Sequence, residues 1–272
     1  MLTNSNSSNS PFRSVDSPVL ALHAPGFPPP HHDVEPDIFV RQANMLGHVQ
    51  ERVSAGHVAV VGCGGLGGWI APALARAGVS RLTLIDPDFF DRSNAPRQLM
   101  YGGDIGEPKA HALAKNVVPH MTSAGSVIGV CLTFDEAFGH LSSAPDVLVV
   151  GVDNNAARSG ASTWGLRYRV PVIFAMLSLD GLRTQVFCQR PAGACLACVL
   201  PNSDPSAYAP CAAASSASCQ LAAAHAVHMT ITTLSGSTVP AWRETSLDGS
   251  TERHGSPSRR RDCPVCSASL DA

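Results

Sequence analysis

Charged side chains are scarce in this chain of 272 residues: they make up 15% of the sequence, and the formal net charge is −2. Nucleic acids and anionic membrane surfaces attract proteins with a marked excess of basic side chains, which this composition lacks. No apolar run approaches the roughly 18 residues that a membrane-spanning helix needs. We therefore expect neither a nucleic acid nor a membrane as a partner.

The first residues also lack the order of a secretory signal peptide, in which an apolar stretch follows a basic one. They are rich in Ser, Asn and Pro instead. This favours a cytoplasmic location, where the nine cysteines stay reduced unless they bind metal. With 44% hydrophobic residues, the chain is long enough for one large α/β domain with a full core.

The stretch from His57 to Gly68 is the most informative part of the chain. An apolar run ends in glycines spaced as G-x-G-x-x-G, a helical stretch follows, and a second apolar run ends in Asp86. Glycines let the backbone approach phosphates, a helix N-terminus offers N–H donors, and an acid at the next strand end takes ribose hydroxyls. The pattern predicts a nucleotide site without choosing between a dinucleotide and ATP. The loop glycines are Gly62, Gly64, Gly65 and Gly67.

The residues beyond the second apolar run favour ATP. Asn94, Arg97 and Lys109 follow it in turn. A nicotinamide pocket does not need a cluster of cations, whereas cleavage of ATP between its α- and β-phosphates needs fixed positive charge near the transferred phosphorus and the departing pyrophosphate. Another apolar run ends in Asp153, followed by Asn154, and a carboxylate there is suited to holding Mg²⁺ against phosphate oxygens.

In order and spacing, these motifs resemble the E1-like adenylating enzymes of the ThiF, MoeB and HesA type, relatives of the ubiquitin-activating enzymes. The resemblance extends from about Ile38 to Cys266. It implies a homodimer that uses ATP and Mg²⁺ to adenylate the C-terminal carboxylate of a small ubiquitin-like or sulfur-carrier protein, with release of pyrophosphate. The residues that carry it are Arg41-Gln42, the glycine loop, Asp86, Asn94, Arg97-Gln98, Lys109, Asp153-Asn154 and two later Cys-x-x-Cys pairs.

The resemblance also implies residue roles. The glycines admit the phosphates, Asp86 takes the ribose hydroxyls, and Asp153 holds Mg²⁺ with Asn154 beside it. Asn94, Arg97 and Lys109 contact the phosphates and stabilise transition-state charge. Arg41 reaches the triphosphate from the partner subunit, the alternative being a salt bridge on a helix surface.

Cys211 follows Pro210 in an Ala/Ser-rich segment, where members of this family carry the thiol that receives the activated acyl group. Two interpretations stay open: Cys211 is a covalent relay, or it only lines a loop. Cys219 is a second, weaker candidate for the same role.

Two other functions stay open as alternatives. The same adenylation chemistry could act on a peptide or on tRNA, or the chain could be a non-catalytic or NAD(P)-binding protein with a Rossmann-like fold. The combination of Asn94, Arg97, Lys109 and Asp153 argues against the last of these. We see no β-grasp or rhodanese segment after Leu234, so the activated carboxylate is expected to come from another molecule.

Two Cys-x-x-Cys pairs, Cys195 with Cys198 and Cys263 with Cys266, together offer four thiolates to one tetrahedral ion. A closed site of this kind predicts a structural zinc ion that staples the C-terminal segment to the rest of the chain. The alternative is a redox dithiol, for which one such motif at the start of a helix would suffice.

Apolar runs that alternate with helical stretches predict a Rossmann-like, doubly wound and mainly parallel α/β sheet with a C-terminal zinc-stapled segment. One helix is expected over Ile38–Ala55 and another over Gln220–Leu234. The expected division is a disordered leader (1–36), an ATP-binding core (37–200), a crossover loop and helix (201–234), and a polar tail (235–272). The expected strands are Val58–Val61, Leu82–Ile85, Val127–Leu132, Val147–Val152, Val172–Ala175 and Thr184–Cys188.

Overall fold

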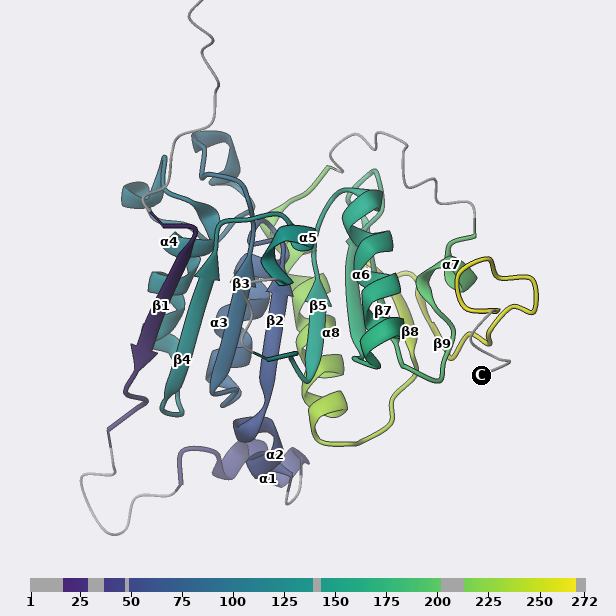
Figure 1. Cartoon of the computed structure of the whole chain (residues 1–272), viewed down its shortest axis with the longest axis horizontal. Helices are drawn as coiled ribbons and strands as arrows, with labels where there is room; N and C mark the ends of the chain where they lie inside the picture. Colours follow the sequence, from purple (N-terminus) through teal and green to yellow (C-terminus); the bar gives the residue numbers. More distant parts are fainter. Residues whose placement is uncertain (1–16, 29–36, 47–48, 139–142, 202–212, 268–272) are drawn as a thin grey trace, which may run out of the picture.

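The computed structural model describes residues 17–28, 37–46, 49–138, 143–201 and 213–267. Within these residues, nine strands form a single sheet in the order β1-β4-β3-β2-β5-β6-β7-β8-β9 (Figure 1). The five neighbours from β4 to β6 are parallel, and the strands outside them pair antiparallel. The strands are β1 (Val19–Ala24), β2 (His57–Val61), β3 (Arg81–Ile85), β4 (Gly125–Val130), β5 (Val147–Val150), β6 (Val172–Leu177), β7 (Arg183–Gln189), β8 (Trp242–Ser246) and β9 (Glu252–Gly255).

The central strands are covered on both faces. Every residue of β2 and β5 is buried, as expected for the apolar runs of a parallel sheet with helices on both sides. All six strands expected from the sequence are present. The mixed, Rossmann-like α/β sheet is thereby confirmed, and it is parallel only in its middle.

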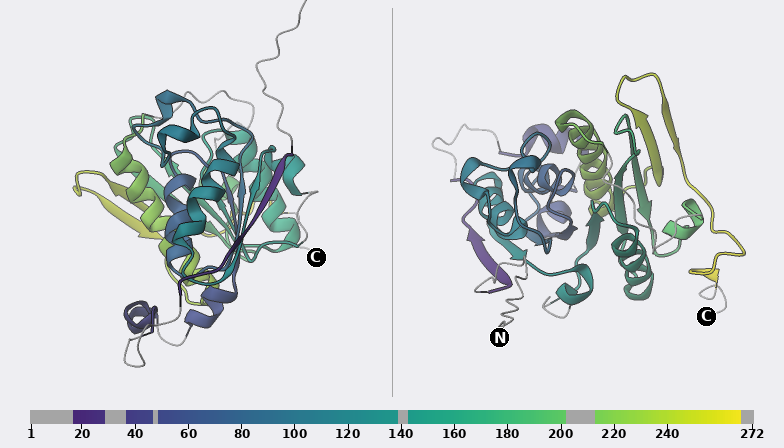
Figure 2. Two further views of the ribbon diagram at one scale, coloured as in Figure 1. Left: turned by 90° about the vertical axis from the view of Figure 1, so that its left-hand side faces the viewer. Right: turned by 90° about the horizontal axis from the view of Figure 1, so that it is seen from above.

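Helices α3, α4 and α8 cover one face of the sheet, and α5 and α6 cover the other (Figure 2). Among the described residues, none of the helices combines the length and the apolar character needed to cross a membrane. The helices are α1 (Val40–Leu46), α2 (Gln50–Ala55), α3 (Gly67–Arg76), α4 (Lys109–Val117), α5 (Phe134–Ala137), α6 (Asn155–Tyr168), α7 (Leu196–Val199) and α8 (Ser216–Leu234), with 3₁₀ turns at Arg92–Asn94, Gly102–Asp104 and Val118–His120.

The N-terminal segment was expected to be a disordered leader, and this is wrong for its middle part. Residues Val19–Ala24 form β1, which pairs antiparallel with β4 at one edge of the sheet. Val19 packs on the core of one face, while Leu22 and Ala24 pack on the core of the other. This alternation of apolar contacts stabilises the strand although the surrounding sequence is polar.

The expected single helix over Ile38–Ala55 is two helices, α1 and α2. Gly47 lies between them in the sequence, and glycine is a poor helix former. Helix α8 begins earlier than predicted, because the hydroxyl of Ser215 accepts a hydrogen bond from the Ser218 amide (3.1 Å) and caps its first turn.

The polar C-terminal tail contributes two strands to the sheet. Strand β8 pairs with β7, and β9 pairs with β8 at the far edge. All of β9 is at least partly exposed, and Glu252, Arg253 and His254 are exposed. A strand exposed in this way shows little apolar periodicity, which is why the sequence analysis predicted only a polar tail here.

Candidate active site

The glycine loop leaves the carboxyl end of β2 through a conformation that glycine favours. Gly62 has a φ of +89°, and its amide donates to the carbonyl oxygen of Ile85 over 2.8 Å. A side chain at Gly67 would overlap the carbonyl oxygen of Gly62, so Gly67 permits α3 to start directly against the loop. Gly62, Gly64 and Gly65 line a cavity at this edge of the sheet, and Gly67 is not among its lining residues.

Asp86 lies at the end of β3 and is 6% exposed. Its carboxylate accepts hydrogen bonds from the backbone amides of Cys63 (2.7 Å) and Asp88 (2.8 Å), and so connects β3 to the glycine loop. Burial raises the pKa of Asp86 to about 6, against the opposing effect of the Lys109 charge. Each oxygen retains a lone pair for a further donor such as a ribose hydroxyl.

Lys109 begins α4 and is 8% exposed. Its Nζ pairs with the Oδ2 of Asp88 at 2.9 Å. Burial alone would lower the pKa of Lys109, but Asp86 and Asp88 together raise it, so the ammonium keeps its charge although the side chain is largely buried.

Asn94 and Arg97 lie on the segment between β3 and α4. Asn94 is buried, and its Oδ1 accepts the amide of Asp91 (3.1 Å), which fixes a 3₁₀ turn. Arg97 donates from Nη1 to the carbonyl of Ser93 (3.0 Å). Both residues line the cavity, with Gln98 next to them.

Asp153 and Asn154 follow β5 on the other side of the glycine loop. Asp153 is exposed and lines the cavity. The Oδ1 of Asn154 accepts the amide of Ala157 (2.8 Å) and caps α6. Asn154 also lines the cavity, so its capping role adds to the predicted contact with the nucleotide.

The cavity that these segments enclose has a volume of about 690 Å³, within the usual range for ligand sites. Its lining comes from the carboxyl ends of β2, β3, β4 and β5, where ligands bind in open α/β sheets. The predicted residues that it brings together are Gly62, Gly64, Gly65, Asp86, Asn94, Arg97, Lys109, Asp153 and Asn154.

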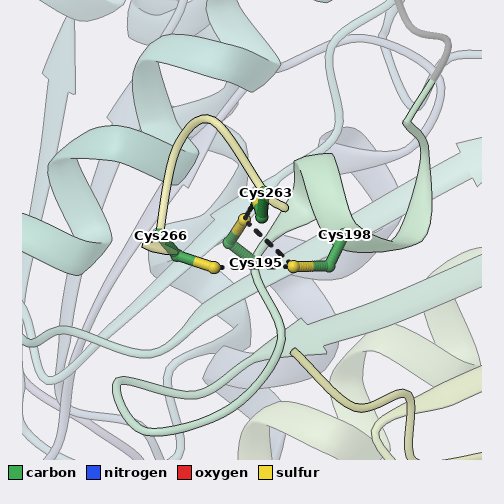
Figure 3. A group of neighbouring side chains, drawn as sticks. All are labelled: Cys195, Cys198, Cys263 and Cys266. Carbon is green, nitrogen blue, oxygen red and sulfur yellow. Dashed lines mark hydrogen bonds between the residues drawn. The ribbon is translucent and has the colours of Figure 1, made fainter. Parts of the chain in front are cut away.

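The four cysteines of the two Cys-x-x-Cys pairs form a separate cluster beside α7 (Figure 3). Their ligand atoms all lie within 4.8 Å of one another. The Sγ of Cys195 is 3.7 Å from that of Cys198 and 3.5 Å from that of Cys263, and Cys198 is 3.5 Å from Cys266. Four sulfurs around a zinc ion would be about 3.8 Å apart, given Zn–S bonds of about 2.3 Å in a tetrahedron.

Backbone amides favour the ionised form of one sulfur in this cluster, that of Cys263, whereas burial raises the pKa of Cys195 and of Cys266. Burial acts to raise the pKa of Cys263, but the amides of Cys266 and Val265 and the neighbouring thiols lower it to about 7. The amide of Arg260 points at the Sγ of Cys198 (3.4 Å). Four buried cysteine sulfurs at this spacing fit a zinc ion.

Comparison with known proteins decides the family. The sequence model of the ThiF family matches residues 38–265, most of the chain. The chain belongs to the ThiF family.

The curated relatives of this chain carry names that describe different activities. The tRNA threonylcarbamoyladenosine dehydratase of Haemophilus influenzae is 30% identical over 126 residues, 45% of this chain and 48% of that protein. The sulfur carrier protein adenylyltransferase of Thermus thermophilus is 31% identical over 169 residues, 59% of this chain and 61% of that protein. The chain thus spans about half the length of the curated relatives it matches.

Among solved structures, Escherichia coli MccB bound to AMPCPP and MccA has a TM-score of 0.70. The match covers 87% of this chain and 76% of that chain at 19% identity, which establishes a shared fold.

Two residues predicted from the family pattern, Arg41 and Cys211, are not among the described residues that line the cavity. Arg41 is exposed on α1, at the amino ends of the strands and opposite the cavity (Figure 1). Its neighbour Gln42 donates to the carbonyl of Ala77 (2.8 Å) and so ties α1 to the end of α3. The action of Arg41 in a partner subunit remains a prediction, and Cys211 lies outside the described residues.

Cys219 does line the cavity. It is buried in the first turn and a half of α8, and its Sγ would lie 2.9 Å from a Cβ placed on Gly65. Burial raises the pKa of the Cys219 thiol, against a smaller opposing effect of Arg97. A buried thiol with a raised pKa is a poor nucleophile, which weakens the case for Cys219 as the acyl acceptor.

Sequence reasoning missed one cation that lines the cavity, Arg158. Its Nη2 donates to the carbonyl of Val152 (2.7 Å) and its Nη1 to Asn155 (3.1 Å), and its buried Nε has no partner among the described residues. Burial lowers the pKa of Arg158, and Asp153 opposes this. Its position five residues after Asp153 was the available signal, because that spacing places it on the first turn of the next helix.

Proposed function

We propose that this protein is an ATP-dependent adenylyltransferase. A carboxylate oxygen of the substrate attacks the α-phosphorus of ATP, the bond between that phosphorus and the bridging oxygen to the β-phosphate breaks, and pyrophosphate leaves with the bond electrons. The products are an acyl adenylate and pyrophosphate.

One observation carries this proposal: a single cavity is lined by phosphate-compatible glycines, a buried ribose acceptor and three cations, Arg97, Lys109 and Arg158. Arg97 and Lys109 enter it from the same segment, and Asp86 and Asp153 flank the glycine loop. Fixed charge in a site that is partly closed to water stabilises a transition state better than mobile charge in water. This arrangement suits phosphoryl chemistry more than the transfer of a hydride.

The residue roles follow from position. Gly64 and Gly65 admit the phosphates, and Asp86 accepts the ribose hydroxyls. Lys109 exchanges Asp88 for phosphate oxygens when ATP binds, because Asp88 is the more exposed partner of that ion pair. Asn94 and Arg97 complete the contacts to the phosphates.

Asp153 offers a carboxylate for Mg²⁺, which is commonly held in proteins by one or two carboxylates together with substrate phosphates. When bound, the ion would neutralise charge on the departing pyrophosphate. The exposure of Asp153 to the cavity fits this role.

We infer that the substrate is the C-terminal tail of a small ubiquitin-like or sulfur-carrier protein and that the enzyme acts as a homodimer. The name of the Thermus thermophilus relative supports the class of substrate. We further propose that zinc occupies the four-cysteine cluster and that Cys211 is a candidate relay for the acyl group.

Exchange between ATP and labelled pyrophosphate, measured with candidate carrier proteins, tests the proposed reaction. The expected result is exchange that depends on one such protein, together with a carrier whose intact mass has increased by one adenylate. A chain that binds ATP but shows no exchange with any carrier, peptide or tRNA would contradict the proposal.

A second substrate class deserves the same assay, because a tRNA-modifying enzyme is among the relatives. In that case exchange would depend on tRNA rather than on a protein tail. The near-neutral composition of the chain favours the protein tail.

A further inference from the structure

The proposed ATP site leaves one polar side chain of the cavity without a role. Asp135, the second residue of α5, is exposed and lines the cavity together with Phe134. Within the part of the chain that the structure describes, its carboxylate has no hydrogen bond or ion pair. A carboxylate that lines a nucleotide cavity can accept a hydrogen bond from a donor group of the ligand.

The order of the strands indicates which part of ATP comes near Asp135. The four strands whose ends form the cavity are arranged β4-β3-β2-β5. The proposed phosphate groups occupy the ends of β2 and β5, where the glycine loop and Asp153 lie, and the ribose lies at Asp86 on β3. The base must continue in the same direction, over the end of β4, and the residues that follow β4 include Asp135.

The local structure holds in place the turn that carries Asp135. The carboxylate of Glu136 accepts hydrogen bonds from both the amide (3.1 Å) and the hydroxyl (2.7 Å) of Thr133. Phe134 is 6% exposed and packs edge-on against Phe138 with ring centroids 4.6 Å apart. The hydroxyl of Thr133 therefore donates to Glu136 and keeps only neutral lone pairs for a ligand. Asp135, whose Oδ1 would lie 3.5 Å from a Cβ placed on Gly160 of α6, is the charged acceptor that this turn brings to the cavity.

We propose that Asp135 selects adenine by accepting a hydrogen bond from its exocyclic 6-amino group. A carboxylate accepts and cannot donate, so it favours a base with an amine at this position and disfavours one with a carbonyl oxygen. Phe134 supplies an apolar surface beside it. This inference rests on the proposed function, because it assumes that the cavity binds a nucleoside triphosphate.

A double-mutant cycle between the side chain and the amino group tests the proposal. The affinities of the full chain for ATP and for purine riboside triphosphate, which has hydrogen in place of the amine, are measured by calorimetry with Mg²⁺. We expect the wild type to prefer ATP by about tenfold or more, the usual size of a charge-assisted hydrogen bond. Asp135→Ala should bind the two nucleotides equally, and Asp135→Asn, which keeps the shape of the side chain, should show an intermediate preference.

Glu136→Gln is the matched control, because it removes one charge at the next position and keeps an oxygen for the cap of α5. It should retain the wild-type preference. If Asp135→Ala keeps the full preference for ATP, or if the wild type has none, the proposal is wrong while the nucleotide site stands. If the wild type binds neither nucleotide, the proposed function fails and this inference fails with it.

Discussion

At the scale of single residues, the ion pair between Lys109 and Asp88 determines how the cavity presents its positive charge. The Lys109 ammonium is buried and held at 2.9 Å from a carboxylate that is itself exposed. We expect Lys109→Ala to reduce pyrophosphate exchange by about 10²-fold or more, because a preorganised charge is lost from a site with little water. The other lysine on α4, Lys115, pairs with Glu107 on the surface and does not line the cavity, so Lys115→Ala should exchange at the wild-type rate. Equal rates of pyrophosphate exchange in the two variants would show that Lys109 has no catalytic role.

The pKa of Asp86 predicts a pH dependence of nucleotide binding. With a pKa raised to about 6, Asp86 is ionised and accepts ribose hydroxyls above that pH, and it gains a proton as the pH falls through it. We therefore expect the preference for ATP over 2′,3′-dideoxy-ATP to decline by about tenfold from pH 7.5 to pH 5, the usual size of a hydrogen bond to a charged group. The comparison of two triphosphates cancels the titration of the phosphates themselves. Asp86→Asn should show a small preference that does not vary with pH, and a wild-type preference that is constant over this range would contradict the assignment.

At the scale of elements, the four-cysteine cluster holds the end of the chain against α6 and α7. Elemental analysis should find about one zinc ion per chain, from the count of four ligands. Cys263→Ser should lose the ion and become sensitive to protease in residues 256–267, since binding of the metal and ordering of that segment are coupled. Cys131→Ser, which changes a cysteine outside the cluster, should keep both the zinc and the resistance. A wild type without zinc that resists protease equally well would show that packing alone holds this segment.

Strand β1 gives a second prediction for an element. Removal of residues 1–24 should lower the melting temperature and promote self-association, because it exposes the edge of β4. Removal of residues 1–16 leaves β1 in place and is the matched control. Thermal unfolding and light scattering measure the two effects, and identical behaviour of the two truncations would mean that β1 contributes nothing to the sheet.

The elements also show where sequence reasoning succeeded and where it could not. The glycine loop and Asp86 were predictable because strand, turn and helix follow one another locally. Arg158 had a local signal, its place on the helix that follows Asp153, whereas Asp135 had none, since only the order β4-β3-β2-β5 brings its segment to the cavity. Strand β9 was missed because its charged side chains face solvent and leave no apolar period.

At the scale of the whole molecule, Arg41 makes the homodimer testable. It lies opposite the cavity of its own subunit, so any action on ATP must come across an interface. If so, Arg41→Ala and Lys109→Ala are each inactive, but a mixture of the two should regain about a quarter of wild-type exchange, because half of randomly formed dimers are mixed and one of their two sites is intact. A mixture that stays inactive, although native mass spectrometry detects mixed dimers, would place Arg41 outside the active site.

The strand order has a consequence for how the chain matures during synthesis. Strand β2, at the centre of the parallel part, is synthesised early, but one of its two neighbours, β5, is synthesised much later. Strands β6, β7, β8 and β9 each pair with the strand that was synthesised just before them. The ribosome thus releases first the strands β1 to β5, whose pairing is long-range, and then the strands β6 to β9, each of which pairs with the strand before it. Every cavity-lining residue, from Val61 to Cys219, has been translated before β8 begins. A nascent chain can therefore gain its nucleotide before its last two strands and its cysteine cluster exist, and the ligand would then act as a template for the final stage of folding.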